Sequence, residues 1–105
     1  MIKTLNTENS FNKLFRKASR GEENTMFLFT SPDYDTACRE LLVELKRGNH
    51  RLKNNLYIVN SFLTPHAFAA HRTTKVPCLV SVIDKERKSE TYLPFIYERM
   101  GVSLP

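Results

Sequence analysis

A proline directly before a short apolar run constrains the fold of this chain more than any other feature. The run Cys78–Ile83 has the composition of a buried strand. Because proline cannot donate a hydrogen bond to a β-ladder, Pro77 must stand at the start or the edge of that strand. Proline is also the residue before which a cis peptide bond costs little free energy. We therefore expect a strand that opens at Pro77, with a cis bond between Val76 and Pro77.

Length and composition indicate an ordinary globular protein. The chain has 105 residues, enough for one hydrophobic core, so we expect a single domain over residues 1–105. Its content of 41% apolar and 26% charged residues is typical of such domains, and no apolar stretch approaches the length of a membrane span. The segment Met1–Asn6 is too polar for a signal peptide, and two cysteines without a secretory signal favour a reducing compartment. We expect a cytoplasmic protein that is not bound to a membrane.

Hydrophobic periodicity predicts the element order βαβαβαββα. The expected strands are Ile2–Leu5, Thr25–Thr30, Leu56–Val59, Cys78–Ile83 and Ser89–Leu93. The expected helices begin near Asn6 or Thr7, Asp35, Pro65 and Pro94 and end near Gly21, Gly48, Arg72 and Gly101. Thr64 is predicted to cap the third helix, Phe68 to anchor it, and Asp84–Lys88 to form a charged turn. Alternating strands and helices followed by a late hairpin indicate an α/β fold with a central mixed sheet flanked by helices.

The segment Phe27–Arg39 carries a resemblance to a known family. It consists of an apolar strand, a polar loop and a helix with a cysteine in its first turn. With the element order and the proline before the penultimate strand, it resembles the thioredoxin family, and the resemblance is best from Thr25 to Asp84. In that family the helix begins with the motif Cys-x-x-Cys, which is matched here by Asp35-Thr36-Ala37-Cys38. The second cysteine is present, and an aspartate replaces the first, the exposed nucleophile.

The replaced cysteine changes the chemistry that the resemblance implies. Thiol–disulfide exchange needs an accessible thiolate that attacks and a second thiol that resolves the mixed disulfide. Asp35 can do neither, but its carboxylate can cap the helix. Phe29 stands where redox members of the family place a buried acid, and Val43 stands where they have a helix proline. The resemblance therefore implies a degenerate member without redox activity, in which we expect no catalytic residue and no cofactor.

The resemblance also implies a binding site. In thioredoxin-like folds the backbone before the cis-proline is exposed and pairs with an extended peptide, a mode in which main-chain hydrogen bonds give affinity. The expected site consists of Val76 and Pro77, with the facing loop formed by Pro32, Asp33, Tyr34 and Asp35. Degenerate members of the family serve as components of larger assemblies, including spliceosomal and DNA-replication machinery. We therefore expect a protein partner, with the chain acting as an adaptor or a small subunit.

An enzymatic alternative rests on the two cysteines. Cys38 lies in the first turn of a helix, where backbone N–H groups can lower the pKa of a thiol. A monothiol redox protein would act through Cys38, with Cys78 as a resolving partner. Against this stands the expectation of two reduced cysteines in the core, since free cysteine is among the most buried residue types.

A basic surface gives a third possibility. The net charge is +5, and the densest cationic cluster consists of Lys46, Arg47, Arg51 and Lys53. This cluster could contact nucleic acid or another anion, although solubility alone also explains a positive charge. The three histidines do not have the spacing of metal ligands, so we expect no metal site.

Overall fold

The computed structural model describes residues 1–103 and gives them the predicted order βαβαβαββα. The strands are β1 (Ile2–Leu5), β2 (Thr25–Thr30), β3 (Asn55–Asn60), β4 (Cys78–Ile83) and β5 (Glu86–Glu90). The helices are α1 (Glu8–Ser19), α2 (Thr36–Lys46), α3 (Pro65–Ala70) and α4 (Leu93–Met100). The strands form one sheet in the order β1-β3-β2-β4-β5, in which β1, β3 and β2 are parallel and β4 and β5 are antiparallel to their neighbours. The predicted α/β fold with a mixed sheet is confirmed.

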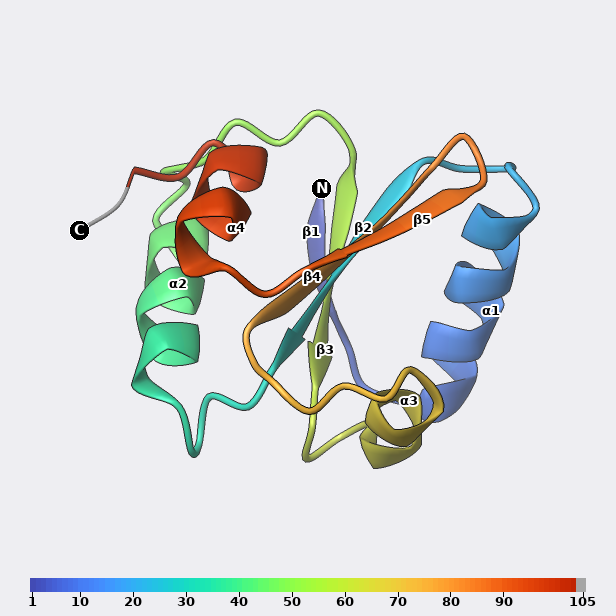
Figure 1. Cartoon of the computed structure of the whole chain (residues 1–105), viewed down its shortest axis with the longest axis horizontal. Coiled ribbons are helices and arrows are strands. Elements are labelled where there is room, and N and C mark those ends of the chain that lie inside the picture. The colour runs from blue at the N-terminus through green and yellow to red at the C-terminus, as the bar shows by residue number, and fades with distance from the viewer. Residues whose placement is uncertain (104–105) are drawn as a thin grey trace.

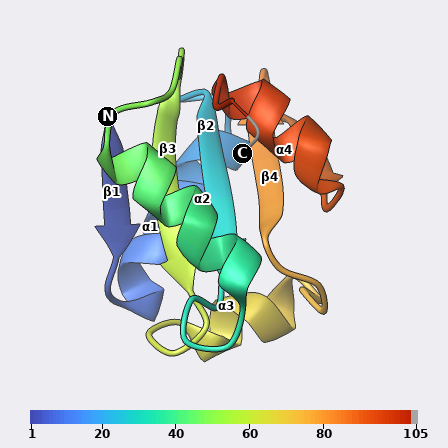
Figure 2. The same cartoon turned by 90° about the vertical axis from the view of Figure 1, so that its left-hand side faces the viewer.

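The sheet is covered on both faces. Helices α1 and α3 lie on one face and helices α2 and α4 on the other, as Figures 1 and 2 show. Side chains of the central strand β2 alternate between the two cores: Phe27 and Phe29 pack toward α1 and α3, and Met26 and Leu28 toward α2 and α4. Every residue of β2 is buried. This explains why its sequence is a continuous apolar run rather than an alternating one.

The predicted edge strand Ser89–Leu93 is wrong in its position. The turn between β4 and β5 contains only Asp84 and Lys85, and β5 begins at once with Glu86. Both turn residues have positive φ (51° and 69°), as a two-residue type I′ hairpin requires, although the usual Asn-Gly sequence is missing. Since β5 is an exposed edge strand, it tolerates a charged sequence that gives no hydrophobic signal.

Helix α3 also differs from the prediction. It ends at Ala70 rather than near Arg72, and its fully buried residue is Ala67, while Phe68 is half-buried against the core. The hydroxyl of Thr64 does not cap the helix, because it donates to the carbonyl of Asn60 at 2.9 Å.

None of the helices within residues 1–103 is long and apolar enough to cross a membrane.

Candidate functional site

The loop Ser31–Asp35 joins the carboxyl end of β2 to α2. Its backbone turns tightly, since the N–H groups of Tyr34 and Asp35 both donate to the carbonyl of Ser31 at 3.0 Å. The Ser31 hydroxyl bonds to the hydroxyl of Ser61 at 2.6 Å, which ties the loop to the segment after β3. The Tyr34 side chain projects outward with 86% of its surface exposed. The loop is therefore anchored at its base and presents an aromatic ring to solvent.

Asp35 is the N-cap of α2, as the sequence predicts. Its Oδ1 accepts the backbone N–H of Cys38 at 2.9 Å. A carboxylate at this position also interacts favourably with the positive end of the helix dipole. The Arg39 guanidinium donates to the carbonyl of Pro32 at 2.7 Å, which holds the loop against the first turn of the helix. The residue in place of a nucleophile thus has a structural role.

The Cys38 thiol is fully buried. Its exposed fraction is 0%, and burial raises the pKa of Cys38 to about 11, with a further increase from the Asp35 carboxylate. A thiol with this pKa is almost entirely protonated near neutral pH, whereas thiol exchange requires the thiolate. In its present environment Cys38 is shielded both from reagents and from ionisation.

Val76 and Pro77 lie beside this loop. The antiparallel pairing of Cys78 with Phe29 brings the start of β4 to the carboxyl end of β2, so both segments reach the same end of the sheet (Figure 2). The Val76–Pro77 peptide bond is cis, Pro77 is buried and Val76 is half-buried. Within residues 1–103, the N–H and C=O of Val76 make no hydrogen bond outside the sheet ladder, which begins only at Cys78. The backbone polar groups of Val76 therefore have no hydrogen-bond partner among the described residues.

The two cysteines are free and have different surroundings. Cys78 belongs to the core beneath α1 and α3, whereas Cys38 lies on α2, which covers the opposite face. Burial raises the pKa of the Cys78 thiol, while the positive charge of Arg87 opposes the increase. The groups that shift the pKa of Cys38 belong to its own loop and helix. The two thiols are thus buried on opposite faces of the sheet.

The sequence analysis missed two exposed apolar side chains next to the loop. Phe62 is 76% exposed and Leu63 is 39% exposed, and both follow β3 directly. Because the carboxyl ends of the parallel strands β2 and β3 meet at one edge, these residues and Tyr34 lie on neighbouring loops. We call Tyr34, Phe62 and Leu63 the apolar rim. The signal available in the sequence was the apolar pair Phe62-Leu63 inside an otherwise polar turn after a buried strand.

The predicted basic cluster is divided by the fold. Arg47 pairs with Glu44 at 3.3 Å, and Lys46 lines a groove between α2 and the edge strand β1. Arg51 and Lys53 line a different groove of about 490 Å³, together with Arg99 and Glu98 of α4. Lys46 thus lines one groove, and Arg51 and Lys53 line another. Within the described residues, no group of three or more His, Cys, Asp or Glu side chains could hold a metal ion.

Comparison with known proteins supports the architecture. No family model and no curated protein sequence matches the chain. Among solved structures, thioredoxin O2 from Arabidopsis thaliana is 21% identical, covers 93% of this chain and 92% of its own, and has a TM-score of 0.71. Thioredoxin from Trypanosoma brucei brucei is 8% identical, with coverages of 94% and 87% and a TM-score of 0.72. Fasciola hepatica thioredoxin is 16% identical, with coverages of 91% and 93% and a TM-score of 0.68. At these identities the likeness is one of fold, and the chain has the thioredoxin-like fold.

Proposed function

We propose that this protein is a non-redox interaction module, an adaptor or a small subunit, that binds an extended segment of a protein partner. The observation that carries the proposal is twofold. Asp35 caps α2 at the position of the missing cysteine, and the remaining thiol of the motif, Cys38, is buried with its pKa raised to about 11. A thioredoxin-like fold without an accessible thiolate keeps its binding surface and loses its reaction.

The binding mode follows from the open backbone of Val76. An extended segment would pair with this backbone as an added strand, and the apolar rim would contact its side chains. Tyr34 and Phe62 supply large exposed ring surfaces on both neighbouring loops. Such aromatic side chains contribute much of the affinity at interfaces. We expect partners that present an extended segment with apolar side chains and at least one unpaired stretch of backbone.

The test is selection of binding peptides from a random display library, followed by binding measurements on matched variants. Tyr34→Ser should weaken binding of the selected peptides about tenfold, which is the size of effect that a central interface aromatic has. Tyr92→Ser is the matched control, since Tyr92 is also an exposed aromatic (58%) but lies at the start of α4. Equal losses in both variants would mean that the selected peptides do not use this site.

A parallel measurement distinguishes the interaction module from a monothiol redox enzyme. Labelling of Cys38 and Cys78 is followed as a function of pH in the native protein, beside a disulfide-reductase assay. Under the proposal both thiols label slowly until the protein unfolds, and no reductase activity appears. Fast labelling of Cys38 at neutral pH, with reductase activity that Cys38→Ser abolishes, would instead identify a monothiol enzyme.

A further inference from the structure

A small pocket lies on the sheet face covered by α1 and α3, away from the apolar rim. It has a volume of about 170 Å³ and opens between the segment that follows α3 and the strand β5. Its lining includes the cationic residues Arg72, Lys75 and Arg87, four residues with hydroxyl side chains, and no carboxylate. The grooves near Arg51 and Lys88 differ, because acidic side chains also line them. This pocket therefore has three cations and no carboxylate in its lining.

The three cations have no acidic partners in the described part of the chain. Its ion pairs join Arg20 to Glu22, Arg47 to Glu44 and Lys88 to Glu86, and none involves the pocket. Alternation along β5 separates Arg87 from Lys88: Arg87 lines the pocket, while Lys88 and Glu90 line a groove on the other face, and Ser89 borders both cavities. Three unpaired cations around one small cavity repel one another, and an anion bound among them would relieve that repulsion.

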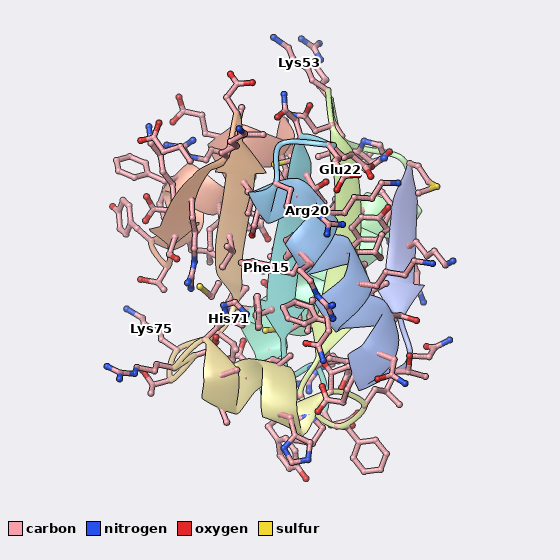
Figure 3. The ribbon with its side chains drawn as sticks, turned by 90° about the vertical axis from the view of Figure 1, so that its right-hand side faces the viewer. Phe15, Arg20, Glu22, Lys53, His71 and Lys75 are labelled. Carbon is pink, nitrogen blue, oxygen red and sulfur yellow. The ribbon has the colours of Figure 1, made fainter. Side chains whose placement is uncertain are left out.

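The Arg87 side chain contacts the Phe15 ring. Its guanidinium carbon lies 5.8 Å from the centre of the Phe15 ring, a cation–π distance. The Phe15 ring in turn packs against His71, with 4.5 Å between ring centres, and Figure 3 shows these two side chains beside the pocket segment that carries Lys75. The His71 Nδ1 atom is buried without a hydrogen-bond partner among the described residues. The pocket thus contains a guanidinium in contact with an aromatic ring and a buried nitrogen without a hydrogen-bond partner.

Arg72 occupies a position where glycine would be expected. Each of the helices α1 to α4 ends with the paired hydrogen bonds of a Schellman motif. In this motif the first or second residue after the last helical residue has positive φ. Glycine takes this position after α1, α2 and α4, but after α3 it is Arg72, with φ of 51°. A non-glycine residue in this region is disfavoured, and such exceptions cluster at functional sites. The local strain places an arginine at the wall of the pocket.

We propose that this pocket binds a phosphate-type group, either inorganic phosphate or a phosphate monoester. Three cations and several hydroxyl donors match the charge and the acceptor oxygens of such a group. The volume admits one tetrahedral anion but not a whole nucleotide. The pocket adjoins the peptide edge through Lys75 and Cys78, but neither Val76 nor Pro77 lines it, so the inference does not depend on the proposed function.

The experiment is a titration of the 15N-labelled full chain at constant ionic strength with inorganic phosphate, with a short phosphoserine peptide and with the same peptide unphosphorylated. We expect saturable shifts of the amide signals of residues 73–75 and 89–91, and no such shifts with the unphosphorylated peptide. Tighter binding of phosphate than of the phosphopeptide would identify a free anion as the ligand. The reverse order would identify a phosphate carried by a peptide. Absence of saturable shifts with both phosphorylated probes would overturn the proposal.

Matched variants separate the pocket from general charge attraction. Arg87→Gln should weaken phosphate binding about tenfold, equal to about 1.4 kcal/mol. Lys88→Gln removes the same charge from the adjacent residue on the other face and should leave the affinity unchanged. Arg72→Gly should weaken binding while raising the thermal midpoint, since glycine relieves the strain. An equal loss in the Arg87 and Lys88 variants would show that phosphate only follows the net charge, which contradicts a built site.

Discussion

The carboxylate of Glu8 on α1 accepts the backbone N–H of His66 at the start of α3, at 2.7 Å. Its second oxygen accepts the N–H of Ala67 at 3.2 Å. A helix from a distant part of the sequence thus provides the cap that Thr64 does not. The two helices share one face of the sheet, so this contact also fixes their relative position (Figure 1).

We predict that Glu8→Ala lowers the free energy of unfolding by about 1–2 kcal/mol, because two N–H groups lose a charged acceptor. Urea denaturation measures the change. Glu86→Ala is the control, since Glu86 is an exposed carboxylate on β5 whose one ion pair is a surface contact at 3.8 Å. The control should change stability by less than about 0.5 kcal/mol. Equal effects in both variants would contradict the capping role.

Asp35 affects both stability and the neighbouring thiol, and two variants separate the effects. Asp35→Ala should cost about 1 kcal/mol of stability through loss of the cap, whereas asparagine also caps well and should cost less. Both variants remove the carboxylate that helps to raise the pKa of Cys38, so both should lower that pKa. Thiolate ultraviolet absorbance as a function of pH reports the pKa. An unchanged thiol pKa in both variants would show that burial alone sets its value.

The raised pKa of Cys38 predicts a loss of stability in alkali. The folded state keeps the thiol proton up to about pH 11, whereas the unfolded chain releases it near pH 9.0. Between these values the folded state binds more protons than the unfolded state, so stability falls as the pH rises, by up to about 2 kcal/mol. Cys38→Ala lacks this titration, and its unfolding free energy should fall less steeply over the same range. Parallel slopes for the two proteins would refute the assignment.

The backbone strain at Arg72 predicts a stabilising substitution. Arg72→Gly should raise the free energy of unfolding by about 1 kcal/mol, because glycine adopts positive φ without a side-chain penalty. Arg72→Ala removes the same charge but keeps a β-carbon, so it should not stabilise the fold. Urea denaturation of the two variants makes the comparison. If alanine stabilised as much as glycine, charge repulsion rather than backbone strain would explain the gain.

The apolar rim predicts a binding defect without a folding defect. Phe62→Ser removes a side chain that is 76% exposed, so its unfolding free energy should change by less than about 0.5 kcal/mol. Its affinity for a peptide selected on the unmodified protein should fall, as in Tyr34→Ser. Retained affinity in Phe62→Ser alone would restrict the site to the Ser31–Asp35 loop and the backbone of Val76.

The elements that bury apolar side chains could be predicted from the sequence. The run of Thr25–Thr30 marks a central strand, and Asp35 marks the start of α2, because burial and capping act locally. Strand β5 could not be placed, since its exposed charged residues satisfy no hydrophobic pattern and its turn adopts positive φ without glycine. The capping of α3 by Glu8 joins residues 58 positions apart, which no local pattern reveals.

The candidate site likewise has features that the local sequence predicts and features that depend on contacts between distant segments. The burial of Cys38 follows from its place on the apolar stripe of α2, whereas the phosphate-type pocket combines cations from a loop and a later strand that belong to no motif. The separation of Lys46 from Arg51 depends on where the chain turns after α2. Sequence proximity had suggested one cluster where the structure forms two surfaces.

The charged strand β5 also controls how the protein meets other chains. An uncovered outer strand normally invites a neighbour to continue the sheet, which is one route to aggregation. Here the charged side chains of Glu86, Arg87, Lys88 and Glu90 disfavour such lateral pairing, because charges on an edge strand must be desolvated when another strand adds to it. Under the proposed function, an extended segment of a partner would pair where β4 begins, at Val76, rather than along β5. The charges of β5 therefore disfavour extension of the sheet along this edge.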